Sequence, residues 1–276
     1  MKRILVPTDF SEQAQYALRV AADLAKKYQA KLYLLHMLGI SQTLITKDES
    51  KSQAEAIYYM ELAKKRFAEL LEKDFLKGVE VETIVQNYTI FSEINSLAHD
   101  KGIDLIVMGS HGTGNLNDFF VGSNTEKVVR TSDFPVLVIK DERPDLKLEK
   151  AVFALDFDSE NMKAFKKGVS FFENLGAEVE LLYVNLPNEK FRSSMEIHEK
   201  VEEFMKAAGR EADVSKVSVR SDYTVENGIY NFVKEKGADV IGIPTHGRRG
   251  LSHFFLGSIG EDLANHAKVP VLTFKI

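Results

Sequence analysis

Two stretches of the chain that begin at residues 111 and 246, 135 positions apart, are closely similar in sequence. Residues 111–137 read HGTGNLNDFFVGSNTEKVVRTSDFPVL, and residues 246–272 read HGRRGLSHFFLGSIGEDLANHAKVPVL. They align without a gap, and 11 of their 27 positions are identical, including HG, FF, GS and PVL. Similarity at one fixed spacing indicates that a unit of the chain has been duplicated.

The beginnings of the two halves also align, at a spacing of 147 residues. Residues 8–10 (TDF) match residues 155–157 (LDF), and residues 30–35 match residues 177–182. The two spacings differ by 12, so the first half carries 12 extra residues between about 37 and 87. We expect most of this extra length in a polar loop.

The repeat therefore predicts two copies of one domain. A chain of 276 residues is also the length expected of two domains at about 150 residues each. We place the domains at residues 1–140 and 150–276, and the extra loop around residues 41–52. Residues 141–149 (DERPDLKLE) are charged and include a proline, which is typical of a linker.

Each half alternates apolar strands with helical segments. The expected strands are residues 3–6, 31–38, 79–85, 105–108 and 135–139, then 151–155, 178–184, 217–220, 240–243 and 271–274. Ser11 suits a helix N-cap, and further helices are expected at 53–75, 92–101 and 123–130. This alternation predicts an α/β fold of two doubly wound domains, in which ligands bind at the carboxyl ends of parallel strands.

Composition excludes several functions. The chain has no cysteine, so it has no disulfides, zinc fingers or iron–sulfur clusters held by thiolates. Its net charge of −5 argues against a broad nucleic-acid surface. No apolar run reaches the roughly 18 residues of a membrane span, and Pro7 to Asp9 interrupt the first apolar run too early for a signal peptide. We expect a cytoplasmic protein.

A glycine-rich loop follows the fourth strand of the first half. It contains Gly109, Gly112, Gly122 and Ser123 in the spacing G-x2-G-x9-G-S. Glycines let a backbone approach a ligand closely, and the free N–H groups at the start of the following helix favour phosphate. Taken alone, the loop fits a tight strand-to-helix connection equally well. It matches neither GxxxxGK[ST] nor GxGxxG.

Together with Pro7-Thr8-Asp9-Phe10-Ser11 after the first strand, this spacing resembles the universal stress protein family. The resemblance covers both halves, so the chain looks like a tandem member. It implies a five-stranded parallel sheet of order 3-2-1-4-5 in each half, with helices on both faces. It also implies that the first half binds ATP or a related adenine nucleotide, which Mg²⁺ can accompany, although the sequence shows no dedicated set of metal ligands.

The resemblance also assigns residues. Asp9 is expected on the adenine–ribose side, with Pro7 and Met37 lining the base pocket. The remaining expected contacts are the loop residues Met108, Gly109, His111 and Gly112, and the phosphate-binding residues Gly122, Ser123, Asn124 and Thr125. In this family, domains often pair through the fifth strand, so we expect the two halves to form an internal pair. A further homodimer is compatible with this arrangement.

The second half departs from the pattern. Pro244 stands at the position of Gly109, and proline lacks an N–H and carries a ring. Arg248 and Arg249 could neutralise phosphate, but they fit a solvated loop as well. We therefore expect weak or no nucleotide binding there, although the second half keeps four motif residues: Asp156, Gly247, Gly257 and Ser258.

We expect no catalytic residue and no dedicated metal site. His111 and His246 lie beside the loop glycines, but nothing in the sequence supplies a group to orient either as a base. The leading interpretation is a stress-response protein that acts by binding a nucleotide. Two alternatives are a slow ATPase, which would need a base and a P-loop lysine that the sequence does not show, and a scaffold that binds no nucleotide.

Overall fold

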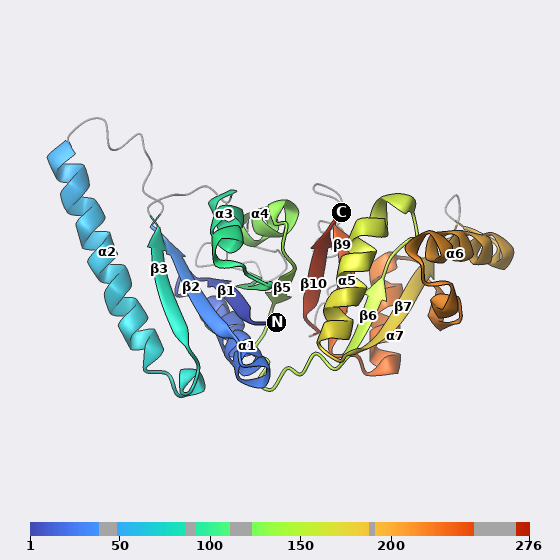
Figure 1. Ribbon diagram of the computed structural model, residues 1–276, viewed down its shortest axis with the longest axis horizontal. Helices are drawn as coiled ribbons and strands as arrows, with labels where there is room; N and C mark the ends of the chain where they lie inside the picture. The colour runs from blue at the N-terminus through green and yellow to red at the C-terminus, as the bar shows by residue number, and fades with distance from the viewer. Residues whose placement is uncertain (39–48, 87–91, 111–122, 188–190, 246–268) are drawn as a thin grey trace. The chain divides into compact units, whose positions relative to one another are not determined.

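A computed structural model describes residues 1–38, 49–86, 92–110, 123–187, 191–245 and 269–276, excluding the side chains of residues 49–55, 92 and 123. The chain divides into two compact units, Met1–Leu146 (unit 1) and Lys147–Ile276 (unit 2). In each unit, strands alternate with helices along the chain (Figure 1). Within the described residues, no helix combines the length and apolarity needed to cross a membrane.

The described residues of unit 1 form five strands. They are β1 (Arg3–Pro7), β2 (Lys31–Met37), β3 (Val81–Gln86), β4 (Leu105–Gly109) and β5 (Val136–Ile139). The helices between them are α1 (Glu12–Tyr28), α2 (Glu49–Leu71), α3 (Ser92–Lys101) and α4 (Ser123–Thr131). A 3₁₀ turn, η2 (Asp74–Leu76), follows α2.

Unit 2 repeats this order. Its strands are β6 (Lys150–Ala154), β7 (Glu178–Asn185), β8 (Val217–Ser221), β9 (Val240–Thr245) and β10 (Val271–Lys275). Its described helices are α5 (Met162–Asn174), α6 (Ser194–Ala208) and α7 (Val225–Lys236). Two 3₁₀ turns, η3 (Ser159–Asn161) and η5 (Glu211–Lys216), precede α5 and β8.

The strands within each unit pair in parallel. Unit 1 has the order β3-β2-β1-β4-β5, and unit 2 has the equivalent order β8-β7-β6-β9-β10. The α/β class and the parallel sheet expected from the alternating pattern are therefore confirmed. In both units the first strand lies between the second and the fourth, so the carboxyl ends of these three strands share one edge of the sheet.

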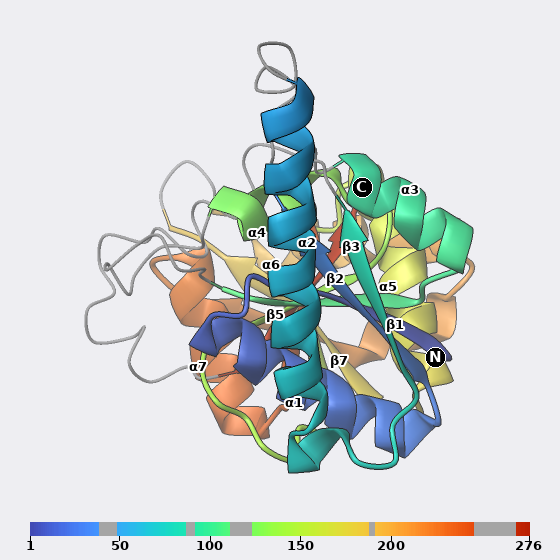
Figure 2. The same ribbon diagram turned by 90° about the vertical axis from the view of Figure 1, so that its left-hand side faces the viewer.

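Helices cover both faces of the unit 1 sheet, which explains the apolar strands. Ile4, Leu5 and Val6 are fully buried, as expected for a parallel strand covered on both sides. The helices contact one another in two groups. α1 contacts η2, the short turn after α2, and α3 contacts α4. Figure 2 shows α2 standing beside β3 at the outer side of the unit.

The second helix differs from its expected bounds. The sequence predicts a helix over residues 53–75, but α2 runs from Glu49 to Leu71 and the chain then tightens into η2. α2 has 23 residues and its counterpart α6 has 15. Residues 49–52, expected in the extra loop around residues 41–52, belong to α2 instead, so part of the extra length of the first half extends a helix.

An aspartate before the fourth strand anchors the first strand in both units. In unit 1 the Asp104 carboxylate accepts hydrogen bonds from the backbone N–H groups of Lys2 and Arg3. In unit 2 the Asp239 carboxylate accepts from the N–H groups of Glu149 and Lys150, both at 2.9 Å. These bonds satisfy donors at the start of β1 and β6, and so fix where each sheet begins.

Replacing Asp104 with alanine should lower the free energy of unfolding by about 1 kcal/mol, because two backbone donors lose a charged acceptor. Urea denaturation followed by circular dichroism measures this loss. Asp100, exposed on α3, is the matched control, and Asp100→Ala should leave the unfolding midpoint unchanged. An equal loss in the two variants would contradict the anchoring role.

Candidate functional site

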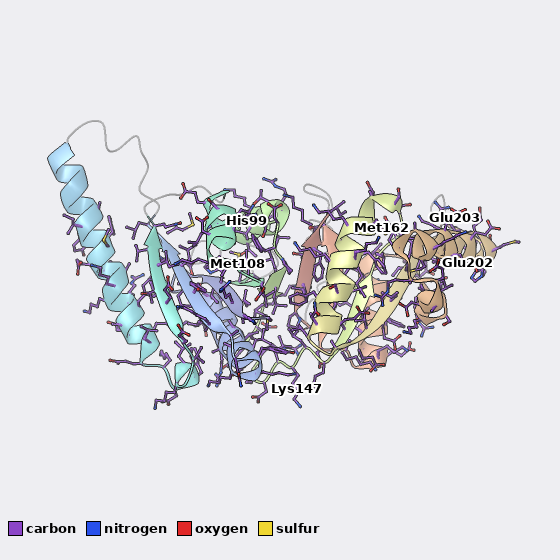
Figure 3. The ribbon with its side chains drawn as sticks, viewed as in Figure 1. His99, Met108, Lys147, Met162, Glu202 and Glu203 are labelled. Atoms are coloured by element: carbon purple, nitrogen blue, oxygen red, sulfur yellow. The ribbon has the colours of Figure 1, made fainter. Side chains whose placement is uncertain are left out.

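Predicted site residues of unit 1 come together at the carboxyl edge of its sheet. Pro7 ends β1, Met37 ends β2, and Met108 and Gly109 end β4, with Met108 labelled in Figure 3. Because β1 pairs with both β2 and β4, these residues belong to three adjacent strand ends. Met108 is buried and Pro7 and Met37 are half-buried, so this edge offers soft, apolar surface.

A tight elbow after β1 places Asp9 at this edge. The Asp9 Oδ1 atom accepts a hydrogen bond from the Ser11 N–H at 3.0 Å, and the Thr8 Oγ1 atom accepts from the Phe10 N–H at 3.0 Å. Phe10 adopts φ +65°, which is uncommon for a bulky residue. Ser11 then caps α1 by accepting from the Ala14 N–H at 3.2 Å. The Asp9 carboxylate is thus oriented by the backbone after it.

Aromatic packing holds the elbow in place. The Phe10 ring lies 4.6 Å from His36 and 5.1 Å from Phe67, measured between ring centroids. The His36 Nδ1–H donates to the Thr8 carbonyl oxygen at 2.8 Å. His36 therefore packs against the elbow and braces it, which explains a histidine at the end of an otherwise apolar strand.

Gly109 is required by the packing of α1. A Cβ atom at this position would lie 2.7 Å from the Gln13 carbonyl oxygen and 2.8 Å from the Gln13 carbonyl carbon. Both atoms belong to the backbone at the start of α1 and cannot move aside as a flexible side chain would. The sequence suggests this glycine as an approach point for a ligand, and the structure gives it this packing role.

The start of α4 is tied to the same glycine. The Thr125 Oγ1–H donates to the Gly109 carbonyl oxygen at 2.7 Å, and Thr125 is only 4% exposed. α4 begins at Ser123, so the backbone N–H groups of its first turn have no partner within the helix. Asn124 is exposed. The hydrogen bond from Thr125 thus holds these donors beside the end of β4.

Several predicted site residues lie outside the described residues. They are His111, Gly112 and Gly122 in the first half, and Gly247, Gly257 and Ser258 in the second. His246, Arg248 and Arg249 also lie there. Their assignment stays a prediction from the sequence.

Unit 2 repeats the elbow around Asp156. The Asp156 Oδ1 atom accepts from the Asp158 N–H at 3.0 Å, and Phe157 adopts φ +57°. Here the Phe157 ring packs against Tyr183 and Phe204, at centroid distances of 6.3 and 5.4 Å. Aligned 147 residues apart, Tyr183 takes the place of His36, so the same strained turn is held by different aromatic neighbours.

The helix after this elbow begins later than in unit 1. α1 begins at Glu12, whereas the aligned residue Ser159 opens the 3₁₀ turn η3 and α5 begins only at Met162. Pro244, on β9, brings a Cβ and a ring to the position where unit 1 has no room for a Cβ. The two units thus differ both at this position and in the start of the helix after the elbow.

Sequence reasoning missed a cleft of about 620 Å³ in unit 2, lined by Asp156 together with Asp158, Tyr183, Val184, Leu186, Phe191, Arg192, Glu196, Lys200 and Val225. The sequence named Asp156 of this lining, and a second signal was the capping box of α6, in which Ser193 and Glu196 bond each other's backbone N–H groups. That pattern marks a helix start, and it carried no information about a cavity.

Three carboxylates, two of which line the cleft, lie close enough together to suggest metal ligands. Asp156, Asp158 and Glu160 each offer an oxygen within 4.8 Å of the others. Lys200 Nζ lies 2.6 Å from Asp158 Oδ1, so an ammonium already offsets one of the three charges. The arrangement is an ion-paired acidic cluster, and we assign no metal to it.

The universal stress protein family model matches the chain twice, at residues 1–140 and 147–275. The universal stress protein MJ0577 of Methanocaldococcus jannaschii is 33% identical over 160 residues, which cover 50% of this chain and 94% of that protein. Slr1230 of Synechocystis, also a universal stress protein, is 23% identical over 298 residues and spans the full length of both chains.

Solved structures agree with the fold. A universal stress protein from Archaeoglobus fulgidus superposes with a TM-score of 0.59 at 22% identity, covering 99% of this chain and 96% of that one. A likeness at this level of identity shows the fold alone.

Replacing Gly109 with alanine should destabilise unit 1 by about 1–3 kcal/mol, because the new methyl group overpacks against the α1 backbone. Thermal unfolding measures the change. The aligned change Pro244→Ala in unit 2, where a Cβ is already accommodated, is the matched control and should cost less. A Gly109→Ala variant as stable as the wild type would refute the packing role.

Replacing Thr125 with valine should cost about 1 kcal/mol, because the buried Gly109 carbonyl loses its donor while the side-chain volume is kept. Chemical denaturation measures the loss. Thr125→Ser, which keeps the hydroxyl, should retain more of the stability than Thr125→Val. The reverse order would mean that the methyl group matters more than the hydrogen bond.

Proposed function

Because the chain belongs to the universal stress protein family, we propose that unit 1 binds an adenine nucleotide, ATP or AMP, and acts through that binding. The observation that carries the proposal is the placement of the G-x2-G-x9-G-S motif. Gly109 ends β4 and Ser123 begins α4, so the loop between them starts at the carboxyl edge of the sheet and ends at a helix N-terminus.

The phosphate end of the proposed ligand would lie at the start of α4. Free backbone N–H groups and the positive end of the helix dipole favour an anion at such a place. A chain of net charge −5 can bind an anion in this way, because the donors are backbone groups rather than a basic surface. Mg²⁺ would accompany ATP through the phosphate oxygens.

The base and ribose would lie against the ends of β1 and β2. Pro7 and Met37 offer apolar contacts to a flat base, and the Asp9 carboxylate can accept hydrogen bonds from ribose hydroxyls. The Ser11 N–H already orients Asp9, so the proposed acceptor is preorganised. Preorganisation lowers the entropic cost of binding.

Unit 2 is proposed to bind the nucleotide weakly or not at all. Pro244 replaces Gly109, and the chain reaches α5 through η3 rather than through a capped helix start. The geometry around the end of the fourth strand therefore differs between the two units. Pairing of the two halves through their fifth strands and a cytoplasmic location both stay predictions.

Replacing Asp9 with asparagine in the full chain should weaken ATP binding about tenfold, or ~1.4 kcal/mol, because hydrogen bonds to a charged acceptor are the stronger ones. Isothermal titration calorimetry measures the affinity. Asp156→Asn is the matched control and should leave ATP affinity unchanged. A loss with Asp156→Asn alone would place the nucleotide in unit 2 instead.

Mass spectrometry of gently purified protein, followed by a timed incubation with ATP, separates binding from catalysis. We expect ATP or AMP to co-purify, ATP to remain intact, and Gly122→Val to abolish binding while Gly257→Val does not. Rapid turnover that Gly122→Val abolishes would favour a slow ATPase. Absence of both bound nucleotide and measurable affinity would favour a scaffold.

A further inference from the structure

The cleft of unit 2 has a shape and a charge pattern of its own. Its volume is about 620 Å³, which is in the range of small-molecule sites. Asp156 and Tyr183 come from the ends of β6 and β7, whereas Arg192, Glu196 and Lys200 belong to α6 and the segment before it. One wall is therefore built by the sheet edge, and another by a helix with charged residues.

Apolar side chains form part of the lining. Phe191 is 63% exposed although it lines the cleft, and Val225 is also exposed. Leu186 and Val184 are half-buried beside them. An exposed phenylalanine at the mouth of a cleft offers a face on which a flat apolar group can stack.

The two cations of the lining, Lys200 and Arg192, both act on carboxylates of the cleft. Lys200 Nζ lies 2.6 Å from Asp158 Oδ1, and its side chain is only 16% exposed. Hydrogen bonds from Ser193, and after them the charge of Arg192, lower the pKa of Glu196. Asn185 fixes the backbone of Arg192 by bonding its N–H at 3.1 Å and its carbonyl oxygen at 2.9 Å. Lys200 is thus paired with Asp158. Arg192 is fixed through its backbone and acts on Glu196 by its charge.

Within the part of the chain that the structure describes, two carboxylates of the cleft, Asp156 and Glu196, form no ion pair with a lysine or arginine, and Glu196 is engaged in the capping box of α6. Among the ion pairs of the described residues, none involves Asp156. Its Oδ1 atom accepts from the Asp158 N–H at 3.0 Å and from the Asn161 Nδ2 group, and Asn161 is only 1% exposed. Although Asp156 is exposed, partial desolvation and, after it, the like charge of Asp158 raise the pKa of its carboxyl group. A positive ligand group next to this carboxylate would relieve that penalty.

We propose that the cleft of unit 2 binds a small organic cation, with its ammonium group against Asp156 and an apolar or aromatic body against Phe191, Leu186 and Val225. This site does not depend on the nucleotide proposed for unit 1. It takes a ligand of opposite charge, at a position where Pro244 has replaced the motif glycine. The duplicated domains would then bind different ligands.

Tryptamine is a suitable probe, because it joins an ammonium group to a flat apolar ring. The chain has no tryptophan, so the fluorescence anisotropy of the indole reports binding without interference when excitation avoids the tyrosines. We expect saturable binding to the full-length protein. Tryptophol, which replaces the ammonium by a hydroxyl, should bind at least tenfold more weakly. Equal binding of tryptamine and tryptophol, or no saturable tryptamine binding, would overturn the proposal.

Three variants test the assignment of residues. Asp156→Asn keeps the side-chain size and an acceptor for the Asp158 N–H, and should weaken tryptamine binding at least tenfold. Phe191→Ala removes an exposed ring at little cost to folding, and should weaken tryptamine binding severalfold. Asp9→Asn is the matched control in unit 1 and should leave tryptamine binding unchanged. Unchanged binding in both Asp156→Asn and Phe191→Ala would overturn the proposal, whatever the outcome for ATP.

Discussion

The close approach between the end of β4 and the first turn of α1 is the contact on which the architecture of unit 1 depends. With 2.7 Å between the Gln13 carbonyl oxygen and the place of a Cβ on Gly109, the strand end admits only glycine without movement. α1 can therefore begin immediately after the elbow at Asp9, and Thr125 can reach the Gly109 carbonyl oxygen from α4. One glycine thus joins the first turns of two helices to the edge of the sheet where the candidate site lies.

Unit 2 differs from unit 1 at this contact. With Pro244 on β9, α5 begins after a 3₁₀ turn, and Asn161 at its start donates to Asp156. The elbow itself is kept, since Phe10 and Phe157 both have positive φ. Duplication therefore preserved the turn that presents the aspartate while the surroundings of that aspartate diverged. Two copies of one fold can in this way carry different binding chemistry.

Local patterns predicted the elements of the fold because each one depends on nearby residues. Apolar runs predicted the strands to within a few residues, and Ser11 caps α1 as expected. α3 has the predicted bounds, Ser92–Lys101. The start of α2 was misplaced, because polar residues near Glu49 suit a loop and an exposed helix equally well. At the site, residues at strand ends could be foreseen, since parallel strands bring their carboxyl ends to one edge.

The sequence by itself determined the duplication, the α/β class, the parallel strands and the aspartate after the first strand of each half, because repeats and periodicity are properties of the chain alone. Only the tertiary structure decided why Gly109 is a glycine and which charges remain unpaired in the cleft of unit 2. Both depend on distances between residues far apart in the sequence, such as Gly109 and Gln13, or Lys200 and Asp158. Such distances are set by the packing of whole elements, which no local pattern records.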